Sequence, residues 1–230
     1  VVRDPKYIHS VSEKVGGTDT IIANGDRNVV FGGAGADTIR LNGSDNVAVG
    51  DNGEAKFAGS DVVKNASGDV VGHVYGDSTK TYLNYVQSTF DAEGDTDTIT
   101  TKDGKNVVIG GTDSDKIATG DGNDIIIGDG GEAYVDRNRE ALFVSNQGRN
   151  LDGSAGSDVI KTSGGDNVIL GGLNSQSRNF DFVKNEQSGE WETTSVDENN
   201  EDLIVSGSGK DVVFGDNAYA TFKGNSSMAN

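Results

Sequence analysis

The stretch Gly32-Gly33-Ala34-Gly35-Ala36-Asp37-Thr38-Ile39-Arg40 is the fullest copy of a nine-residue pattern that recurs along this chain. Its glycines allow the backbone to turn tightly, and its aspartate places a carboxylate at the end of the turn. Steps of nine residues define three copies of one register, whose members are Asp19, Asn28, Asp37, Asn46 and Ala55; Asp97, Asn106, Asp115, Asp124 and Ala133; and Asp158, Asn167 and, after an insertion, Asp202, Asp211 and Ala220. Three copies of one register indicate a repeat architecture.

Composition narrows the class of protein. The 230 residues include 34 glycines and 1 proline, and only 33% are hydrophobic, which is typical of a turn-rich repeat protein or of disorder. The nine-residue period favours the repeat protein. The formal charge is 19 − 37 = −18, so the bare chain repels itself and nucleic acid, and bound divalent cations would relieve the repulsion. Cysteine is absent, which excludes disulfides and thiolate chemistry. The sequence contains no apolar run of about 18 residues, the length that a membrane helix needs, so we expect no membrane insertion.

An apolar residue stands two positions after each register point. These residues are Ile21, Val30, Ile39, Ala48 and Phe57; Ile99, Val108, Ile117, Ile126 and Val135; and Ile160, Ile169, Ile204, Val213 and Phe222. A strand with one inward side chain, followed by a turn, can coil into two parallel sheets around a thin aliphatic core. We therefore predict an all-β fold, a right-handed parallel β-roll with eighteen residues per coil.

The two sheets of this roll differ on their outer faces, because the neighbours of an inward residue in a strand point outward. In one sheet these neighbours are mainly polar and include Thr20, Thr38, Arg40, Thr98, Thr100, Lys116 and Lys161. In the other they are Val29 and Phe31, Val47 and Val49, Val107 and Ile109, Ile125 and Ile127, Val168 and Leu170, and Val212 and Phe214. So large an apolar face is seldom left bare, so we predict that another layer covers it.

The segments between the repeat blocks are the candidate cover. Each block begins with a similar strand, Tyr7-Ile8-His9-Ser10, Tyr85-Val86-Gln87-Ser88 or Leu142-Phe143-Val144-Ser145, and ends with another, Glu54-Ala55-Lys56-Phe57, Glu132-Ala133-Tyr134-Val135 or Tyr219-Ala220-Thr221-Phe222. An outgoing strand and the next incoming strand can form a β-hairpin, and residues 61–75 alternate well enough for extra strands. We thus predict three short rolls: residues 1–78 with a long linker hairpin, residues 79–138, and residues 139–230 with an insertion at about 176–201.

These residues resemble the RTX calcium-binding repeats, the hemolysin-type family whose nonapeptide reads Gly-Gly-x-Gly-x-Asp-x-apolar-x. In that family, backbone carbonyls of the turn and the Asp carboxylate hold calcium ions between successive turns on one edge. The resemblance implies several calcium ions with ligands at Asp19, Gly32, Ala34, Gly35, Asp37, Asp97, Gly110, Thr112, Asp115, Gly153, Ala155, Gly156, Asp158 and Asp202. The closing turns of the blocks add Asp51, Asp129 and Asp216, which sit at a different turn position and are expected to complete the last site of each roll.

The opposite edge departs from the family pattern. Its register positions hold Asn28, Asn46, Asn106 and Asn167, and an amide ligates calcium only through a neutral oxygen. These turns either bind metal weakly or stack through side-chain hydrogen bonds. Asp124 and Asp211 restore the carboxylate there, and we rank both below the first edge.

The resemblance favours a calcium-binding structural module of a large secreted or surface-anchored bacterial protein, adhesin-like and folded by extracellular calcium after type I secretion. Its expected partners are calcium ions and cell-surface or matrix glycans or proteins. A first alternative is the calcium-folding region of a type I-secreted enzyme or toxin. A second is a glycan-binding module that uses the insertion, whose Phe180, Phe182 and Trp191 more simply cover the apolar sheet.

No catalytic residue is predicted. His9 and His73 stand alone without the spacing of a zinc site, and no Gly-x-Ser-x-Gly motif with plausible His and Asp partners occurs. The many carboxylates lie on the nine-residue register rather than as a pair in an apolar pocket.

Overall fold

All regular secondary structure in the described part of the chain is β-strand. The computed structural model describes residues 5–11, 14–58, 60–64, 70–75, 82–89, 94–146, 155–173, 182–184, 191–193, 201–216 and 218–222. Within these ranges the strands form three six-stranded sheets and two short hairpins, and no helix long and apolar enough to cross a membrane is present. The predicted all-β class is confirmed.

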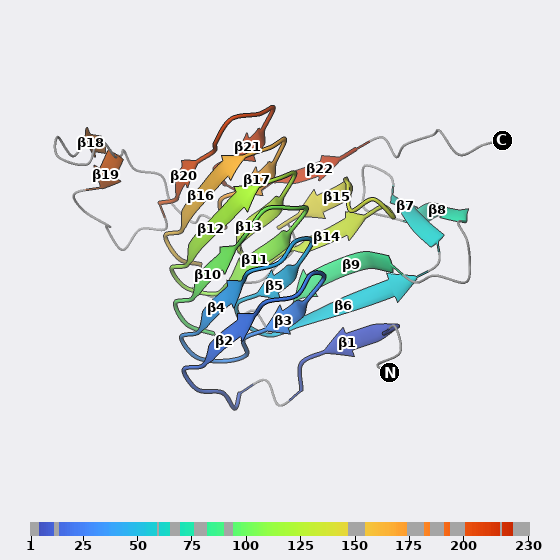
Figure 1. Ribbon diagram of the computed structural model, residues 1–230, viewed down its shortest axis with the longest axis horizontal. Coiled ribbons are helices and arrows are strands. Elements are labelled where there is room, and N and C mark those ends of the chain that lie inside the picture. Colours follow the sequence, from blue (N-terminus) through green and yellow to red (C-terminus); the bar gives the residue numbers. More distant parts are fainter. Residues whose placement is uncertain are drawn as a thin grey trace.

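Two parallel sheets form the coil (Figure 1). The solvent-facing sheet contains β2 (Thr20–Ala23), β4 (Thr38–Leu41), β10 (Thr98–Thr101), β12 (Lys116–Asp121), β16 (Val159–Gly164) and β20 (Leu203–Val205). The middle sheet contains β3 (Val29–Phe31), β5 (Val47–Val49), β11 (Val107–Gly111), β13 (Ile125–Asp129), β17 (Val168–Leu170) and β21 (Val212–Phe214). The chain alternates between them, and the predicted inward residues, such as Ile39, Ile99 and Ile126, form one buried cluster between the sheets. The predicted parallel β-roll is confirmed.

The three repeat blocks stack end to end in one continuous roll. Strand β4 of the first block pairs with β10 of the second, and β12 of the second pairs with β16 of the third. The aliphatic core therefore crosses the boundaries drawn at residues 78 and 138, and the three short rolls expected from the sequence share one core. Stacking in this way pairs the edge strands that separate rolls would leave open.

A third, antiparallel layer covers the middle sheet. This covering sheet contains β1 (Tyr7–His9), β6 (Gly53–Ala58), β9 (Tyr82–Ser88), β14 (Glu132–Val135), β15 (Ala141–Ser145) and β22 (Tyr219–Thr221). The predicted hairpins join the blocks, with Ala55 opposite Val86 and Ala133 opposite Val144. The inner face of the covering sheet packs on the outer valines, isoleucines and leucine of the middle sheet in a second apolar cluster. The prediction of a buried outer face is confirmed.

Two further hairpins lie in the segments between strands of the coil. Strand β7 (Ser60–Lys64) pairs with β8 (Val70–Tyr75), as the alternation of residues 61–75 predicts. Strand β18 (Phe182–Lys184) pairs with β19 (Trp191–Thr193) in the insertion. Phe180 lies outside the described residues, and the outer face of the middle sheet is already covered by the antiparallel layer.

Candidate metal centre

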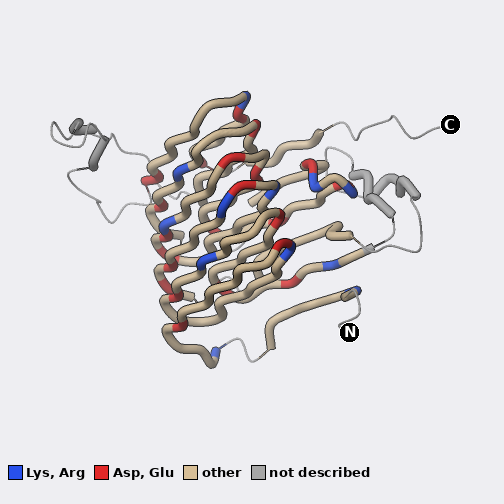
Figure 2. Tube along the Cα trace, in the orientation of Figure 1, with Lys and Arg blue, Asp and Glu red and all other residues tan. Residues whose placement is uncertain are grey.

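The turns that lead from the middle sheet to the solvent-facing sheet place six aspartates in one row. We call this side of the roll the first edge; its row is Asp19, Asp37, Asp97, Asp115, Asp158 and Asp202, and Figure 2 shows a column of acidic residues along it. Each main-chain N–H of the row donates to Oδ1 of the next aspartate, for example from Asp97 to Asp115 at 2.7 Å and from Asp115 to Asp158 at 2.8 Å. One oxygen of each carboxylate from Asp37 to Asp202 is thus used in a ladder that fixes the turns.

The second oxygen of these carboxylates, Oδ2, takes no part in the ladder. Oδ2 of Asp37, Asp97, Asp115 and Asp158 is buried without a hydrogen-bond partner, and these residues are at most 2% exposed. An unpaired buried carboxylate oxygen is costly, and a bound cation is a partner that offsets the cost.

Each of these oxygens lies beside a backbone carbonyl and beside a glycine, whose missing side chain leaves space next to both oxygens. We call each such space a cradle. A Cβ added at Gly110 would lie 2.0 Å from the carbonyl oxygen of Gly128 and 2.3 Å from Oδ2 of Asp115. The same arrangement recurs at Gly32, Gly50, Gly128 and Gly171. Carboxylate and carbonyl oxygens are the ligands that calcium prefers. Among the described residues no three His, Cys, Asp or Glu side chains converge as a metal cluster. The first edge instead brings one carboxylate oxygen and one backbone carbonyl together beside each glycine.

The space beside the turn glycine can be tested by a matched pair of substitutions. Gly110→Ala is expected to destabilise the calcium-loaded chain by about 2–4 kcal/mol, because the new methyl group would overlap a carbonyl and a carboxylate oxygen. Gly215→Ala is the control, since Gly215 has the same turn position in the last turn and nothing lies within 4 Å of an added Cβ. Urea unfolding in calcium measures the stability of both variants. Equal losses of stability would contradict the close contact between an added Cβ at Gly110 and the two oxygens.

The second edge carries the opposite turns and is built differently. Its register residues form the same ladder, with the N–H of Asn28 donating to Oδ1 of Asn46 at 3.0 Å. The outer atom of each asparagine is a nitrogen and is satisfied: Nδ2 of Asn46 donates to the Gly43 carbonyl at 2.6 Å, and Nδ2 of Asn106 to the Lys102 carbonyl at 2.8 Å. An amide N–H therefore takes the place where the first edge presents an unpaired oxygen. Of the two alternatives left open for this edge, the geometry favours stacking by hydrogen bonds.

Asp124 is the exception on the second edge. Its Oδ1 accepts from the backbone N and from Nδ2 of Asn106, while its Oδ2 is buried without a partner. Burial raises the pKa of Asp124 to about 6. Asp211 lies in the last coil, where its Oδ1 accepts from the N–H of Asn167 at 3.0 Å. The two residues ranked below the first edge thus have different surroundings.

Burial raises the pKa of five first-edge aspartates, Asp37, Asp97, Asp115, Asp158 and Asp202. It raises the pKa of Asp97 to about 8 and that of Asp202 to about 7. Burial, reinforced by the charges of neighbouring aspartates, holds the pKa of Asp115 and Asp158 well above the usual range. The ionised row is therefore unfavourable in the folded chain unless positive charge is supplied.

Asp51 is the first of the closing-turn aspartates, and it lies where the covering sheet interrupts a first-edge turn. The chain leaves a first-edge turn after Gly50-Asp51, runs through the covering sheet, and returns at residues 94–97 to finish the same turn. Oδ2 of Asp51 accepts from the backbone N of Thr112 at 2.6 Å and from its Oγ1 at 2.9 Å. This carboxylate ties the interrupted turn to the next one, and its Oδ1 remains buried without a partner.

Asp129 does the same at the second interruption. Its Oδ1 accepts from the N–H of Gly156 at 3.1 Å, and its Oδ2 accepts from the N–H of Leu173 at 2.5 Å. Asp216 occupies the same position in the last turn and is exposed. Because the roll continues through both interruptions, Asp51 and Asp129 join blocks rather than close separate rolls.

The structure places the other expected ligands in the same turns. The carbonyl of Ala34 faces Gly16, where an added Cβ would lie 1.8 Å away, and Gly35 has a positive φ of 111°. Thr112 and Gly156 donate to the closing-turn aspartates, Ala155 bridges to Asp113, and Gly153 lies outside the described residues. The sequence prediction missed Gly50, Gly128 and Gly171, whose carbonyls line the cradles. Their signal was available, since each directly follows an apolar strand at the position of Gly32.

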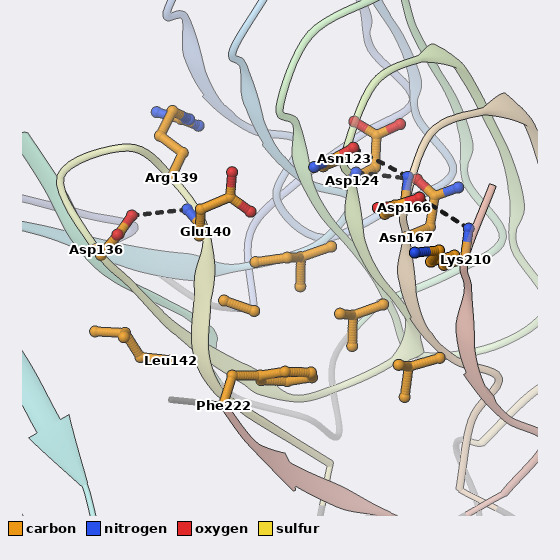
Figure 3. A pocket seen from close by; sticks show the side chains of 14 residues that line it. Asn123, Asp124, Asp136, Arg139, Glu140, Leu142, Asp166, Asn167, Lys210 and Phe222 are labelled. Atoms are coloured by element: carbon orange, nitrogen blue, oxygen red, sulfur yellow. Dashed lines mark hydrogen bonds between the residues drawn. The ribbon is translucent and has the colours of Figure 1, made fainter. Parts of the chain in front are cut away.

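A cavity of about 330 Å³ lies between the second edge and the covering sheet (Figure 3). Three of its polar side chains accept main-chain hydrogen bonds. Asn123 accepts from the N–H of Asp166 and Asp166 from that of Lys210, between neighbouring turns of the second edge, and Asp136 accepts from that of Glu140 within the β14–β15 turn. These bonds fix the second-edge turns on one side of the cavity and the β14–β15 turn on the other.

Comparison with known protein families gives a match to three segments of the chain. The family model described as the RTX calcium-binding nonapeptide repeat (4 copies) matches residues 15–48, 100–133 and 150–175. No curated protein and no solved structure matches the chain significantly.

Proposed function

Because this chain is built on RTX calcium-binding nonapeptide repeats, we propose that it is a structural module that folds when calcium ions occupy the first edge of its roll. One contrast carries the proposal: the first edge presents buried, unpaired carboxylate oxygens where the second edge presents satisfied amide nitrogens. The same backbone ladder runs along both edges, so the difference lies in the charge that each requires.

Residues of successive turns would hold the ions. Oδ2 of Asp37, Asp97, Asp115, Asp158 and Asp202 lies next to the carbonyls of Gly50, Gly110, Gly128, Gly171 and Gly215, respectively. A divalent ion in each cradle would neutralise the carboxylates and cross-link one turn to the next. Since the cradles form only when the turns stack, the free energy of binding is coupled to the free energy of folding.

The setting we propose is a large secreted or surface bacterial protein, adhesin-like, that meets millimolar calcium outside the cell. Support comes from the repeat family and from the three similar units that share one covering sheet. Of the proposed partners, calcium ions are the one that the geometry of the first edge supports. Cell-surface or matrix glycans and proteins remain proposed partners, and we propose no catalytic role.

The calcium-folding region of a type I-secreted enzyme or toxin is the second candidate. It would share the first-edge chemistry, because an RTX module is a calcium-binding structural region in either setting. A catalytic domain encoded in the same chain would favour it. A glycan-binding role for the insertion at 176–201 would be tested by glycan-array binding that is lost in Trp191→Ala.

Calcium titration tests the proposed function directly. We expect weak β-structure in chelator, because the carboxylates of the first edge repel one another, and a cooperative gain of β-signal as calcium is added. Far-ultraviolet circular dichroism follows the folding, and isothermal calorimetry counts the ions, which should be several per chain. A fully folded spectrum in chelator that calcium does not change would refute the proposal.

A further inference from the structure

Within the described part of the roll and its covering sheet, the exposed large apolar side chains are concentrated at the two ends. We call residues 5–11 and 14–31 the first rung, and residues 201–216 and 218–222 the last rung. Leaving aside the β7–β8 and β18–β19 hairpins, the described side chains of this kind are Tyr7, Val11, Val15 and Ile22 in the first rung and Val205, Val212, Val213 and Tyr219 in the last. The coils between the rungs leave no such side chain exposed within the described ranges.

One row on the outer face of the solvent-facing sheet makes the pattern plain. Reading across the paired strands, the row runs Ile22, Arg40, Thr100, Ala118, Lys161 and Val205. Edge strands usually carry charges that prevent further pairing. Here the charges stand in the interior of the sheet and the aliphatic side chains stand at its edges, with Ile22 55% and Val205 42% exposed. The two edge strands of this sheet, β2 and β20, are therefore suited to pairing with another strand.

The chain contains two examples of how such a rung is continued. At each internal junction the outgoing strand of one unit pairs antiparallel with the incoming strand of the next, as Ala55 does with Val86. At the same junction both parallel sheets continue, with Ile39 opposite Ile99 and Ala48 opposite Val108. The junction between the second and third units repeats all three pairings. Three sheets are thus extended together whenever one unit meets the next.

We propose that the last rung is a docking surface for the first rung of a second copy of this chain. The register of the internal junctions places Ala220 opposite Ile8, Ile204 opposite Ile21, and Val213 opposite Val30 of the second copy. The described charges are complementary, because the last rung has four acidic residues and one basic residue while the first rung has three basic and two acidic. Such a head-to-tail contact is heterologous, so it leads to open chains of copies.

Docking would also complete a first-edge turn, a consequence that rests on the proposed function. Within the chain, Gly128-Asp129 of one unit and residues 155–158 of the next make up one interrupted turn, and Asp129 accepts the N–H of Gly156. In the last rung Gly215-Asp216 is the first half of such a turn, and an added Cβ at Gly215 would meet nothing within 4 Å. The second half, residues 16–19, comes from the second copy, which brings Asp19 to the cradle. Association should therefore strengthen with calcium.

Sedimentation velocity on the 230-residue chain in calcium tests the docking, with circular dichroism run alongside to establish folding. We expect the average mass to rise above the monomer as protein concentration increases. Ile22→Lys and Val205→Lys each place a charge at one end of the roll and should weaken self-association at least about tenfold. Ala118→Lys is the matched control, since it adds the same charge to the same row in the interior and should leave association unchanged.

Mixing the two end variants tests the polarity. Ile22→Lys keeps an intact last rung and Val205→Lys an intact first rung, so an equimolar mixture should form one-to-one dimers and no longer chains. Dimers formed by either variant alone would overturn the head-to-tail arrangement. A folded, calcium-loaded chain that stays monomeric would overturn the docking and leave the calcium-dependent fold intact. A chain folded equally with and without calcium contradicts the proposed function instead, and its sedimentation still decides the docking.

Discussion

Asp115→Asn is expected to stabilise the calcium-free chain while reducing the number of calcium ions that it binds. In the native chain Oδ2 of Asp115 is buried without a partner beside the Gly128 carbonyl. An amide nitrogen at this place would donate to that carbonyl, as Asn106 Nδ2 donates to Lys102 on the second edge. We expect a gain of about 1–3 kcal/mol in chelator, because the desolvated negative charge is removed. Circular dichroism in chelator, where the variant should show more β-signal than the native chain, measures the gain, and calorimetry should show the loss of at least one ion.

The reverse substitution on the other edge is the matched control. Asn106→Asp removes an amide that donates to the Lys102 carbonyl and to Oδ1 of Asp124, and it brings two carboxylates together. The variant should be less stable than the native chain in chelator and should regain stability as calcium is added. If both substitutions destabilise the calcium-free chain to the same extent, the assignment of different chemistry to the two edges is wrong.

The calcium-free chain is expected to become more stable as pH falls from about 8 to about 5. The folded pKa values of Asp97 and Asp129, about 8, and of Asp51, about 7, lie above the value of about 4 for an unfolded aspartate. Below about pH 4 both states are protonated and the effect is constant. Between about pH 4 and 8 the unfolded chain has released protons that the folded chain keeps, so stability falls as pH rises.

Calcium should reverse this dependence. Calcium binds the ionised carboxylates, so protons compete with it, and the stability conferred by calcium should rise as pH increases over the same window. Thermal unfolding followed by circular dichroism, with chelator and with calcium at several pH values, measures both slopes. Slopes of the same sign in the two conditions would show that the first-edge carboxylates do not control folding.

Much of the site could be read from the sequence because each nonapeptide encodes its own turn and strand. Asp37 and Asn46 stand at equivalent positions on opposite edges, and their difference in charge already separates the edge that we propose to bind cations from the edge that stacks by hydrogen bonds. Gly50 and Gly128 follow apolar strands as Gly32 does, but the residues that finish their turns lie far along the chain, at 94–97 and 155–158, so nine-residue spacing does not place their carbonyls beside an aspartate.

The sequence by itself determined the period, the inward residues, the charged edge and the apolar face that had to be covered. These features depend on residues within nine positions of one another, so local spacing is sufficient to specify them. Only the tertiary structure decided that three blocks form one roll and that Asp51 and Asp129 hold its interrupted turns together. The N–H of Asp37 meets Oδ1 of Asp97 across 60 residues, and such a contact depends on where a long excursion returns. That return point is set by pairing in three sheets at once, which no local pattern contains.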